Sequence, residues 1–399
     1  WMYWNAWRVP FEGRTGAVMK IVVVPDSFKE SLRSKEVCDS ITRGIQRVFP
    51  SAHIVNLPLA DGGEGTVEAM VAAAGGEIHE LIVTGPLGKP VRAVYGLIDH
   101  GETAVVELAA IAGLSLIPLE RRDPRFTTTR GVGEMLRHIL TLGVRRIIVG
   151  IGGSGTNNGG AGMAQGLGYR LLDSEGNELQ PGAAALASLA SIKPEDVPEE
   201  LFRTEIIVAS DVKNPLCGKE GASRVYGPQK GATPEMIEDL DLALAHFADV
   251  VERELGKSIR DLPGAGAAGG MGAGLVAFAN GKLQSGFDLV AERCRLREQF
   301  RDADLIITGE GALDGQSVYG KAVSGVVRLA REFRVPVVAL TGRLSPGYER
   351  LYSEGLTAAF ALADGPLSLK ESVSRTRELL MDRTEAIVRL WAAGKGSRV

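Results

Sequence analysis

The sequence predicts an α/β protein with two domains: a doubly wound, mostly parallel sheet domain and a second, mixed α/β domain inserted into it. The chain has 399 residues, more than one simple hydrophobic core normally holds. Apolar strand segments alternate with amphipathic helical segments at both ends of the chain, which is typical of a doubly wound sheet. Between them, residues 81–106 alternate apolar and polar side chains around the turn sequences GPLGKP and DHGE, which indicates antiparallel strands.

The doubly wound domain begins with MKIVVVP at residues 19–25, an apolar run that predicts a buried parallel strand. An amphipathic helix follows from Ser34, and we expect a second strand over 52–59 and a helix over 67–74. The pattern returns at the other end of the chain, with strands expected over 303–308, 335–341 and 358–362 and helices over 321–333, 347–355 and 367–393.

The inserted domain is expected over residues 80–292, so that residues 19–79 and 293–399 together form the doubly wound, Rossmann-like domain. Further strands of the insertion are RRIIVG at 145–150 and EIIVA at 205–209, with helices between them. The space between two such domains is a usual place for a small-substrate site.

Composition excludes several classes of partner. The formal net charge is −4 and no basic block stands out, so nucleic acid is not expected to bind. No apolar run approaches the length of about 18 residues that spans a membrane. The three cysteines are scattered without metal-ligand spacing, which suits a reducing, cytoplasmic compartment.

Residues 1–18 hold three of the four tryptophans and lack any period, so we expect a non-native or disordered extension. The oligomeric state is open, and a homodimer is one expectation.

Five groups of glycine-rich polar loops follow expected strands or precede expected helices, where ligands of open α/β sheets bind. In the first loop, DSFKES, Lys29 could hold a phosphate as a point charge or be a surface lysine near a helix cap. In the second, DGGEGT, Asp61 and Glu64 would repel an anion. They suit a metal ion, or a base with its orienting group, and the alternative is a solvated turn.

The third and fourth loops have the residue types of anion sites. In TTTRGVG, the hydroxyl of Thr128, the guanidinium of Arg130 and a helix N-terminus together suit a carboxylate or a phosphate, or else form an ordinary cap. The most specific signal is GGSGTNNGG at 152–160, where glycine amides and hydroxyls predict a nest for phosphates. It is neither a Walker A loop nor the dinucleotide fingerprint, because the required spacings are absent.

The fifth group gathers four shorter segments, each of which could also be simple turn chemistry. They are DVKNP at 211–215, GPQKG at 227–231, the glycine run at 264–274 and GEGALD at 309–314. The last carries the carboxylates Glu310 and Asp314.

Taken together, these segments resemble the bacterial glycerate kinases of the family that includes the glucarate and glyoxylate pathway enzymes. The matching text is PDSFKESL, PLADGGEGT, TTRGVGE, IGGSGTNNGG, SDVKNPLCG, YGPQKGA, GAGAAGGMGAGL and ITGEGALDGQS. The resemblance runs from about Met19 to Val388. It implies a two-domain α/β fold, ATP as co-substrate with Mg²⁺, D-glycerate as acceptor and 2-phosphoglycerate as product.

Roles for single residues are hypotheses within this resemblance. Asp211 is the candidate base, and Lys29 would neutralise charge on the transferred phosphate. Arg130 would clamp the glycerate carboxylate. The further candidates are Thr128, Asp61 and Asn214 for substrate, Gly152, Gly153, Ser154, Thr156, Asn157 and Lys230 for the nucleotide phosphates, and Glu310, Asp314 and Glu64 for Mg²⁺.

The sequence departs from the usual family pattern at three positions. The family usually reads GGSATNDGG, where this chain has Gly155 and Asn158, and it often has Arg where this chain has Ala312. Two alternatives therefore stay open: a kinase that forms 3-phosphoglycerate or acts on another sugar acid, and a non-catalytic protein that binds a metabolite.

Overall fold

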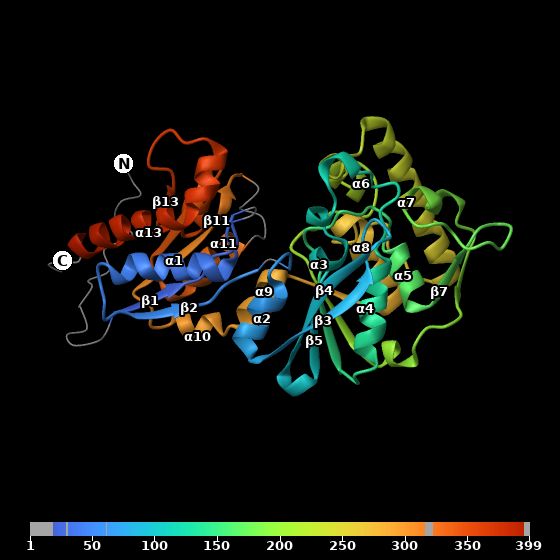
Figure 1. The fold of residues 1–399 in the computed structure, drawn as a ribbon, viewed down its shortest axis with the longest axis horizontal. Coiled ribbons are helices and arrows are strands. Elements are labelled where there is room, and N and C mark those ends of the chain that lie inside the picture. Colours follow the sequence, from blue (N-terminus) through green and yellow to red (C-terminus); the bar gives the residue numbers. More distant parts are fainter. Residues whose placement is uncertain (1–18, 29–30, 61, 316–321, 395–399) are drawn as a thin grey trace.

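The computed structural model describes residues 19–28, 31–60, 62–315 and 322–394. The predictions for residues 1–18, Lys29 and Asp61 lie outside these ranges. Within them the chain forms two lobes, each built around its own sheet (Figure 1). The α/β fold class with two sheets, one parallel and one mixed, is therefore confirmed.

The first lobe contains a five-stranded sheet in the order β13-β12-β11-β1-β2, and every neighbouring pair in it is parallel. Helices α1 and α13 pack together against one face through Val37, Ile41 and Leu380, and α11 covers the other face. Its elements are β1 (Lys20–Val23), α1 (Ser34–Gln46), β2 (His53–Asn56), α10 (Leu296–Phe300), β11 (Leu305–Leu313), α11 (Ala322–Phe333), β12 (Val337–Leu344), α12 (Arg350–Glu354), β13 (Ala358–Ala361) and α13 (Leu369–Gly394).

The second lobe contains a six-stranded sheet in the order β10-β9-β6-β5-β4-β3. Strands β3, β4 and β5 are antiparallel, as the alternation predicts, and β5, β6, β9 and β10 are parallel. Its strands are β3 (Gly76–Thr84), β4 (Pro90–Ile98), β5 (Thr103–Glu107), β6 (Arg146–Gly150), β9 (Glu205–Ala209) and β10 (Lys282–Gln284), with a separate hairpin of β7 (Tyr169–Leu172) and β8 (Ser191–Pro194).

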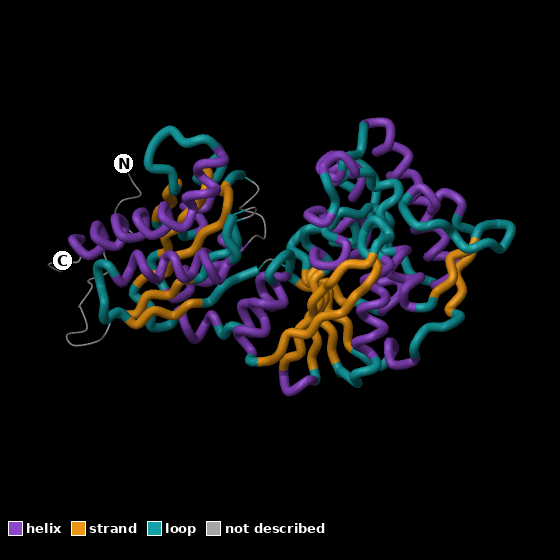
Figure 2. The backbone as a smooth tube through the Cα atoms, in the orientation of Figure 1, coloured by secondary structure: helices purple, strands orange, loops and turns teal. Residues whose placement is uncertain are grey.

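Helices cover both faces of the second sheet (Figure 2). On one face lie α3 (Ala109–Ala112), α4 (Arg130–Leu140), α5 (Ala161–Leu167), α6 (Ala222–Tyr226), α7 (Pro234–Leu255) and α8 (Ala267–Ala279). On the other face lie α2 (Thr66–Ala74) and α9 (Gly286–Arg293). Their apolar side chains, such as Val67 and Phe287, join the core beneath the sheet of the first lobe, so a continuous apolar layer connects the two lobes.

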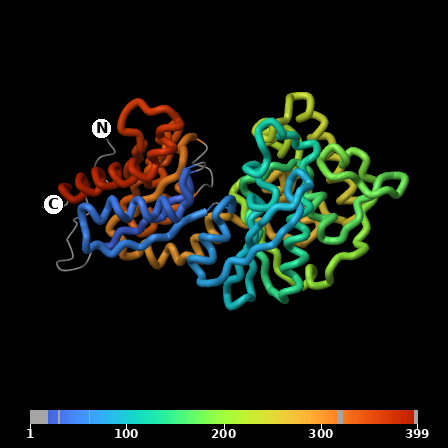
Figure 3. Tube along the Cα trace, viewed as in Figure 1, coloured from blue at the N-terminus to red at the C-terminus, as the bar shows by residue number. Residues whose placement is uncertain are grey.

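Three expectations about the fold differ from the structure. Helix α2 packs against β4 and β5 instead of the first sheet, and the expected domain limit at residues 79–80 falls inside β3. We propose that the domains divide where the chain crosses between the sheets, within residues 57–60 and 62–65 after β2 and at residues 294–295 between α9 and α10 (Figure 3). The expected loop at 309–314 is mostly strand, because Gly309 to Leu313 continue to pair with β12.

Candidate active site

The glycine-rich loop of residues 152–160 lies at the carboxyl edge of the second sheet. Strands β5, β6 and β9 end there in register, with Glu107 opposite Gly150 and Gly150 opposite Ala209. The segments that leave these strands meet at one edge, which is where open α/β sheets bind ligands. The structure therefore brings the loop after β6 and the segment around Asp211 to the same edge.

Several amides of this loop are already bonded within the protein. The N–H of Gly152 donates to the carbonyl of Gly62 at 2.9 Å, that of Gly155 to Ala112 at 2.9 Å, and that of Gly159 to Gly269 at 2.9 Å. These three amides hold the loop in place and are not free for a phosphate. Fewer backbone amides are therefore available to a phosphate than the nine-residue motif suggests. Some of its glycines instead allow close packing of the backbone.

Side chains supply polar atoms that remain available in the loop. Thr156, Asn157 and Asn158 are almost fully buried, at 0, 0 and 1% exposure. Among the described residues, the Oγ1 of Thr156, the Oδ1 of Asn157 and the Nδ2 of Asn158 have no hydrogen-bond partner. Buried polar atoms are nearly always paired in native proteins, so three unpaired atoms in one loop indicate a place for a polar ligand.

Lys230 brings a buried cation to the same loop. It ends the short 3-10 helix η6 (Pro228–Lys230), and its side chain is 2% exposed. Its Nζ donates to the Oγ of Ser154 at 2.9 Å and to the carbonyl of Thr156 at 2.6 Å. Burial lowers the pKa of Lys230 to about 7, because the charged form loses its hydration. Among the described residues no carboxylate contributes to this shift or pairs with Lys230, so a bound anion would supply the missing countercharge.

The threonines of the segment TTTR fasten the start of α4 to the glycine-rich loop. The hydroxyl of Thr127 donates to the carbonyl of Gly155 at 3.1 Å, and that of Thr129 to the Oδ1 of Asn158 at 3.3 Å. The Oγ1 of Thr128 accepts the N–H of Arg130 at 3.2 Å. Thr128 therefore satisfies the N–H of the first residue of α4, and its substrate-binding role stays a prediction.

Arg130 lies at the β3 side of the sheet. Its Nε is 3.3 Å from the Oε1 of Glu134, one turn along α4. Glu134 in turn accepts the N–H and the hydroxyl of Thr84 at the end of β3, at 2.7 and 2.8 Å. Three strands, β4, β5 and β6, separate β3 from β9, after which Asp211 lies. The structure thus places the candidate carboxylate clamp and the candidate base at different positions along the edge.

Asp211 contacts the start of α9. Its Oδ1 accepts the hydroxyl of Ser285 at 2.8 Å, and its Oδ2 is 3.3 Å from the N–H of Phe287. The carboxylate therefore faces the N-terminus of α9. Asn214 is used differently, because its Nδ2 donates to the carbonyl of Glu220 at 2.8 Å and its Oδ1 accepts the hydroxyl of Tyr226 at 2.7 Å.

Carboxylates also gather at the carboxyl edge of the first sheet. Glu310, 9% exposed, lies on β11, and the half-buried Asp314 follows that strand. The buried Asp26 follows β1, and its N–H donates to the carbonyl of Gly309 at 2.8 Å. Glu64 is exposed on the loop before α2. Within the described part of the chain, no group of three or more His, Cys, Asp or Glu side chains is placed to hold a metal ion.

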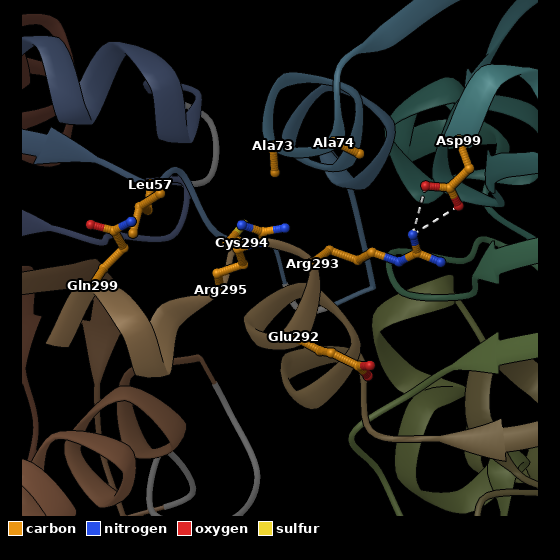
Figure 4. Close-up of a pocket in the computed structure, with 9 residues that line it drawn as sticks. All are labelled: Leu57, Ala73, Ala74, Asp99, Glu292, Arg293, Cys294, Arg295 and Gln299. Carbon is orange, nitrogen blue, oxygen red and sulfur yellow. Dashed lines mark hydrogen bonds and ion pairs between the residues drawn. The ribbon is translucent and has the colours of Figure 1, made fainter. Parts of the chain in front are cut away.

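A cavity of about 670 Å³ lies elsewhere, near the crossing between the lobes (Figure 4). Asp99 follows β4 at the opposite edge of the second sheet, and both of its oxygens accept the Nη1 of Arg293 at 2.8 Å. The cavity contains none of the predicted site residues and is lined by Leu57, Ala73, Ala74, Asp99, Glu292, Arg293, Cys294, Arg295 and Gln299.

Comparison with known proteins places this geometry in a family. The model of the glycerate kinase family matches residues 21–392. The chain belongs to the glycerate kinase family. A glycerate kinase of Bacillus subtilis is 48% identical over 366 residues, which covers 92% of this chain and 96% of the relative. The glycerate 2-kinase of Escherichia coli is 47% identical over 354 residues, covering 89% and 93%.

A solved structure agrees with the glycerate kinase assignment. The crystal structure of a Salmonella typhimurium LT2 protein, provisionally named glycerate kinase 2, has a TM-score of 0.81 and 46% identity. The match covers 95% of this chain and 100% of that one. The sequence-based predictions of family, α/β fold and kinase class are therefore confirmed. No helix among the described residues is long and apolar enough to span a bilayer.

Sequence reasoning missed Glu107, which this family member buries at the end of β5. Its side chain is 4% exposed and accepts two backbone N–H groups from the start of α2. Glu107 lacks the glycine-rich context that singled out the other loops. A signal was nevertheless present in the strand TAVVE. Its apolar residues are followed by a glutamate at the C-terminal end of the strand, where ligands bind in such sheets.

Proposed function

We propose that this chain transfers the γ-phosphoryl group of ATP to the 2-hydroxyl of D-glycerate, forming 2-phosphoglycerate, with Mg²⁺ as the accompanying ion. The family match over residues 21–392 carries the proposal, and the name of the Escherichia coli relative supports the 2-product. The buried and unpaired polar atoms of the glycine-rich loop support a bound anion there.

In this proposal the glycine-rich loop holds the phosphates. The ammonium of Lys230 and the donors Thr156 Oγ1 and Asn158 Nδ2 would bind anionic oxygens, and Asn157 Oδ1 would accept from a ligand hydroxyl. Packing fixes the positions of these groups, and because they are almost fully buried, the segments that cover them would have to move to admit the phosphates. Fixed donors around a transferred phosphoryl group are the main protein contribution to this kind of reaction.

Asp211 remains the proposed base. The hydroxyl of Ser285 and the N–H of Phe287 orient its carboxylate, and a carboxylate has further lone pairs that can accept a substrate proton. Arg130 remains the proposed clamp for the glycerate carboxylate. Because Glu134 now pairs with its guanidinium, binding of glycerate would exchange or share that partner.

The carboxylates fit Mg²⁺ by their chemistry. Mg²⁺ is usually held by one or two carboxylates together with substrate phosphates, so a site of three protein ligands is not required. Glu310 and Asp314, on and after β11, and Glu64 on its exposed loop are the proposed ligands, all with hard oxygen donors. When bound, the ion would neutralise charge on the phosphates of ATP.

The test is an enzyme-coupled assay with Mg-ATP and D-glycerate, in which enolase and pyruvate kinase report 2-phosphoglycerate in the absence of phosphoglycerate mutase. We expect signal without mutase. Signal that appears only after mutase is added would replace the 2-product with the 3-product. No signal with mutase, together with no ADP formed from Mg-ATP in the presence of a panel of other sugar acids, would instead favour a metabolite-binding protein.

A further inference from the structure

Glu107 holds the start of α2 with both oxygens of its side chain. Its Oε2 accepts the N–H of Gly65 at 2.9 Å, and its Oε1 accepts the N–H of Val67 at 2.9 Å. Gly65 precedes the helix with a φ of 89° and offers no side chain that could cap it. The free amides of the first turn therefore take their acceptor from β5, and the carboxylate also interacts favourably with the helix dipole.

The segment fixed in this way is the acidic loop of residues 62–66, where the chain crosses between the lobes. The backbone of this loop contacts the backbone at the carboxyl edge of the second sheet. The N–H of Gly152 donates to the carbonyl of Gly62 at 2.9 Å, and a Cβ added to Gly152 would lie 2.7 Å from the Cα of Gly63. The acidic loop is thus in backbone contact with the glycine-rich loop.

Burial and two neighbouring carboxylates both disfavour the ionised form of Glu107. Burial, followed by the nearby carboxylates Glu68 and Glu64, raises the pKa of Glu107, while its two backbone hydrogen bonds lower it, leaving a value of about 7. Burying a carboxylate among acidic neighbours carries an unfavourable free energy, although the helix that it caps has only nine residues. What Glu107 adds is a tie between this loop and strand β5.

We propose that Glu107 is a positioning residue for the phosphoryl transfer, which fixes the acidic loop against the glycine-rich loop and so sets where Glu64 meets the substrates. The inference rests on the proposed function, because it assumes that the acidic loop takes part in the reaction. Glycine-rich loops lose much conformational freedom on ordering, so an anchor at one end determines how precisely the loop is placed.

The experiment measures kcat and KM for Glu107→Gln, with Glu68→Gln as matched control. Glutamine keeps the shape, but its NH₂ group cannot accept an N–H. Glu68 is a neighbouring carboxylate on α2 that pairs with Arg33 at the surface. We expect Glu107→Gln to lower kcat by roughly 10- to 100-fold, the scale of a misplaced catalytic element. Affinity for an ATP analogue should stay within about threefold, and Glu68→Gln should stay near the wild type.

A second variant covers the case in which Glu107→Gln does not fold. Thr66→Val removes the hydrogen bond from the Thr66 hydroxyl to the carbonyl of Gly63, at 2.7 Å, within the same loop and keeps the side-chain volume. We expect it to lower kcat in the same direction, by several-fold. A folded Glu107→Gln or Thr66→Val with wild-type kcat would overturn the inference, as would a loss of ATP affinity equal to the loss of kcat. A wild-type enzyme inactive on glycerate would overturn the proposed function as well.

Discussion

Replacing Lys230 with methionine removes one buried cation and little volume. In the wild type the ammonium donates to the Oγ of Ser154 and to the carbonyl of Thr156, and it lies beside the unpaired hydroxyl of Thr156. Methionine fills the same channel without a charge. If Lys230 binds the nucleotide phosphates, the variant loses a hydrogen bond between charged groups, which is worth about 1.5–3 kcal/mol. At about 1.4 kcal/mol per tenfold change, kcat/KM for ATP should fall roughly 10- to 100-fold.

The pH dependence gives a second readout of Lys230. Burial lowers its pKa to about 7 in the folded protein, whereas an unfolded lysine titrates near pH 10.4, a typical value. Between these values the unfolded chain binds more protons, so wild-type stability should rise with pH relative to Lys230→Met. ATP affinity should fall as the pH rises above about 7, because Lys230 of the free enzyme then loses its positive charge.

Lys257→Met is the matched control for Lys230→Met. Lys257 is partly buried, and burial lowers its pKa as it does that of Lys230. Its Nζ donates to the carbonyl of Val276 at 3.0 Å, near the end of α8 and away from the glycine-rich loop. Steady-state kinetics and calorimetric ATP binding should show a large effect for Lys230→Met and none for Lys257→Met. Equal ATP affinity in wild type and Lys230→Met would refute a phosphate-binding role for Lys230. Its hydrogen bonds to Ser154 and Thr156 would then only hold the loop in its conformation.

Three further variants test other parts of the site. Asp211→Asn should lower kcat by about 10²–10⁴-fold with ATP affinity retained, and a fall of less than threefold would assign Asp211 to capping α9. Arg130→Lys should chiefly raise KM for glycerate because it loses the planar fork; a raised KM for ATP instead would move Arg130 to the nucleotide. Gly269→Ala should lower the melting temperature by several degrees, the scale of one or more lost kcal/mol. The reason is that Gly269 has φ +70° and an added Cβ would lie 2.0 Å from the carbonyl of Thr156. Gly365→Ala, with open space and ordinary φ, should leave melting unchanged.

Periodicity and turn chemistry predicted most elements of the fold. Apolar runs such as MKIVVVP found buried strands, since both faces of a parallel strand are covered. The helix expected over 67–74 is present as α2, Thr66–Ala74, but the sheet on which it packs could not be predicted, because that depends on long-range contacts. Glycine misled the prediction at 309–314. Gly309 lies within β11 because a Cβ there would be 2.2 Å from the carbonyl of Leu340, so the residue permits close strand approach and does not mark a loop.

The site could be predicted only in part. Motif chemistry drew attention to the loop at 152–160, which lies at a sheet edge with buried, unpaired polar atoms. It could not tell which amides the protein itself uses, such as those of Gly152 and Gly159, because their partners are distant in sequence. It also could not find Glu107, whose side chain bonds two amides that lie 42 and 40 residues earlier in the chain.

The most direct test of the central claim is the structure of the product itself. Purified protein is incubated with Mg-ATP and D-glycerate, and the phosphorylated product is examined by phosphorus–proton correlation NMR. We expect a phosphorus resonance coupled to the single methine proton at C2, which only 2-phosphoglycerate gives. Coupling to the two methylene protons at C3, or a phosphorus spectrum in which ATP is unchanged, would contradict the account.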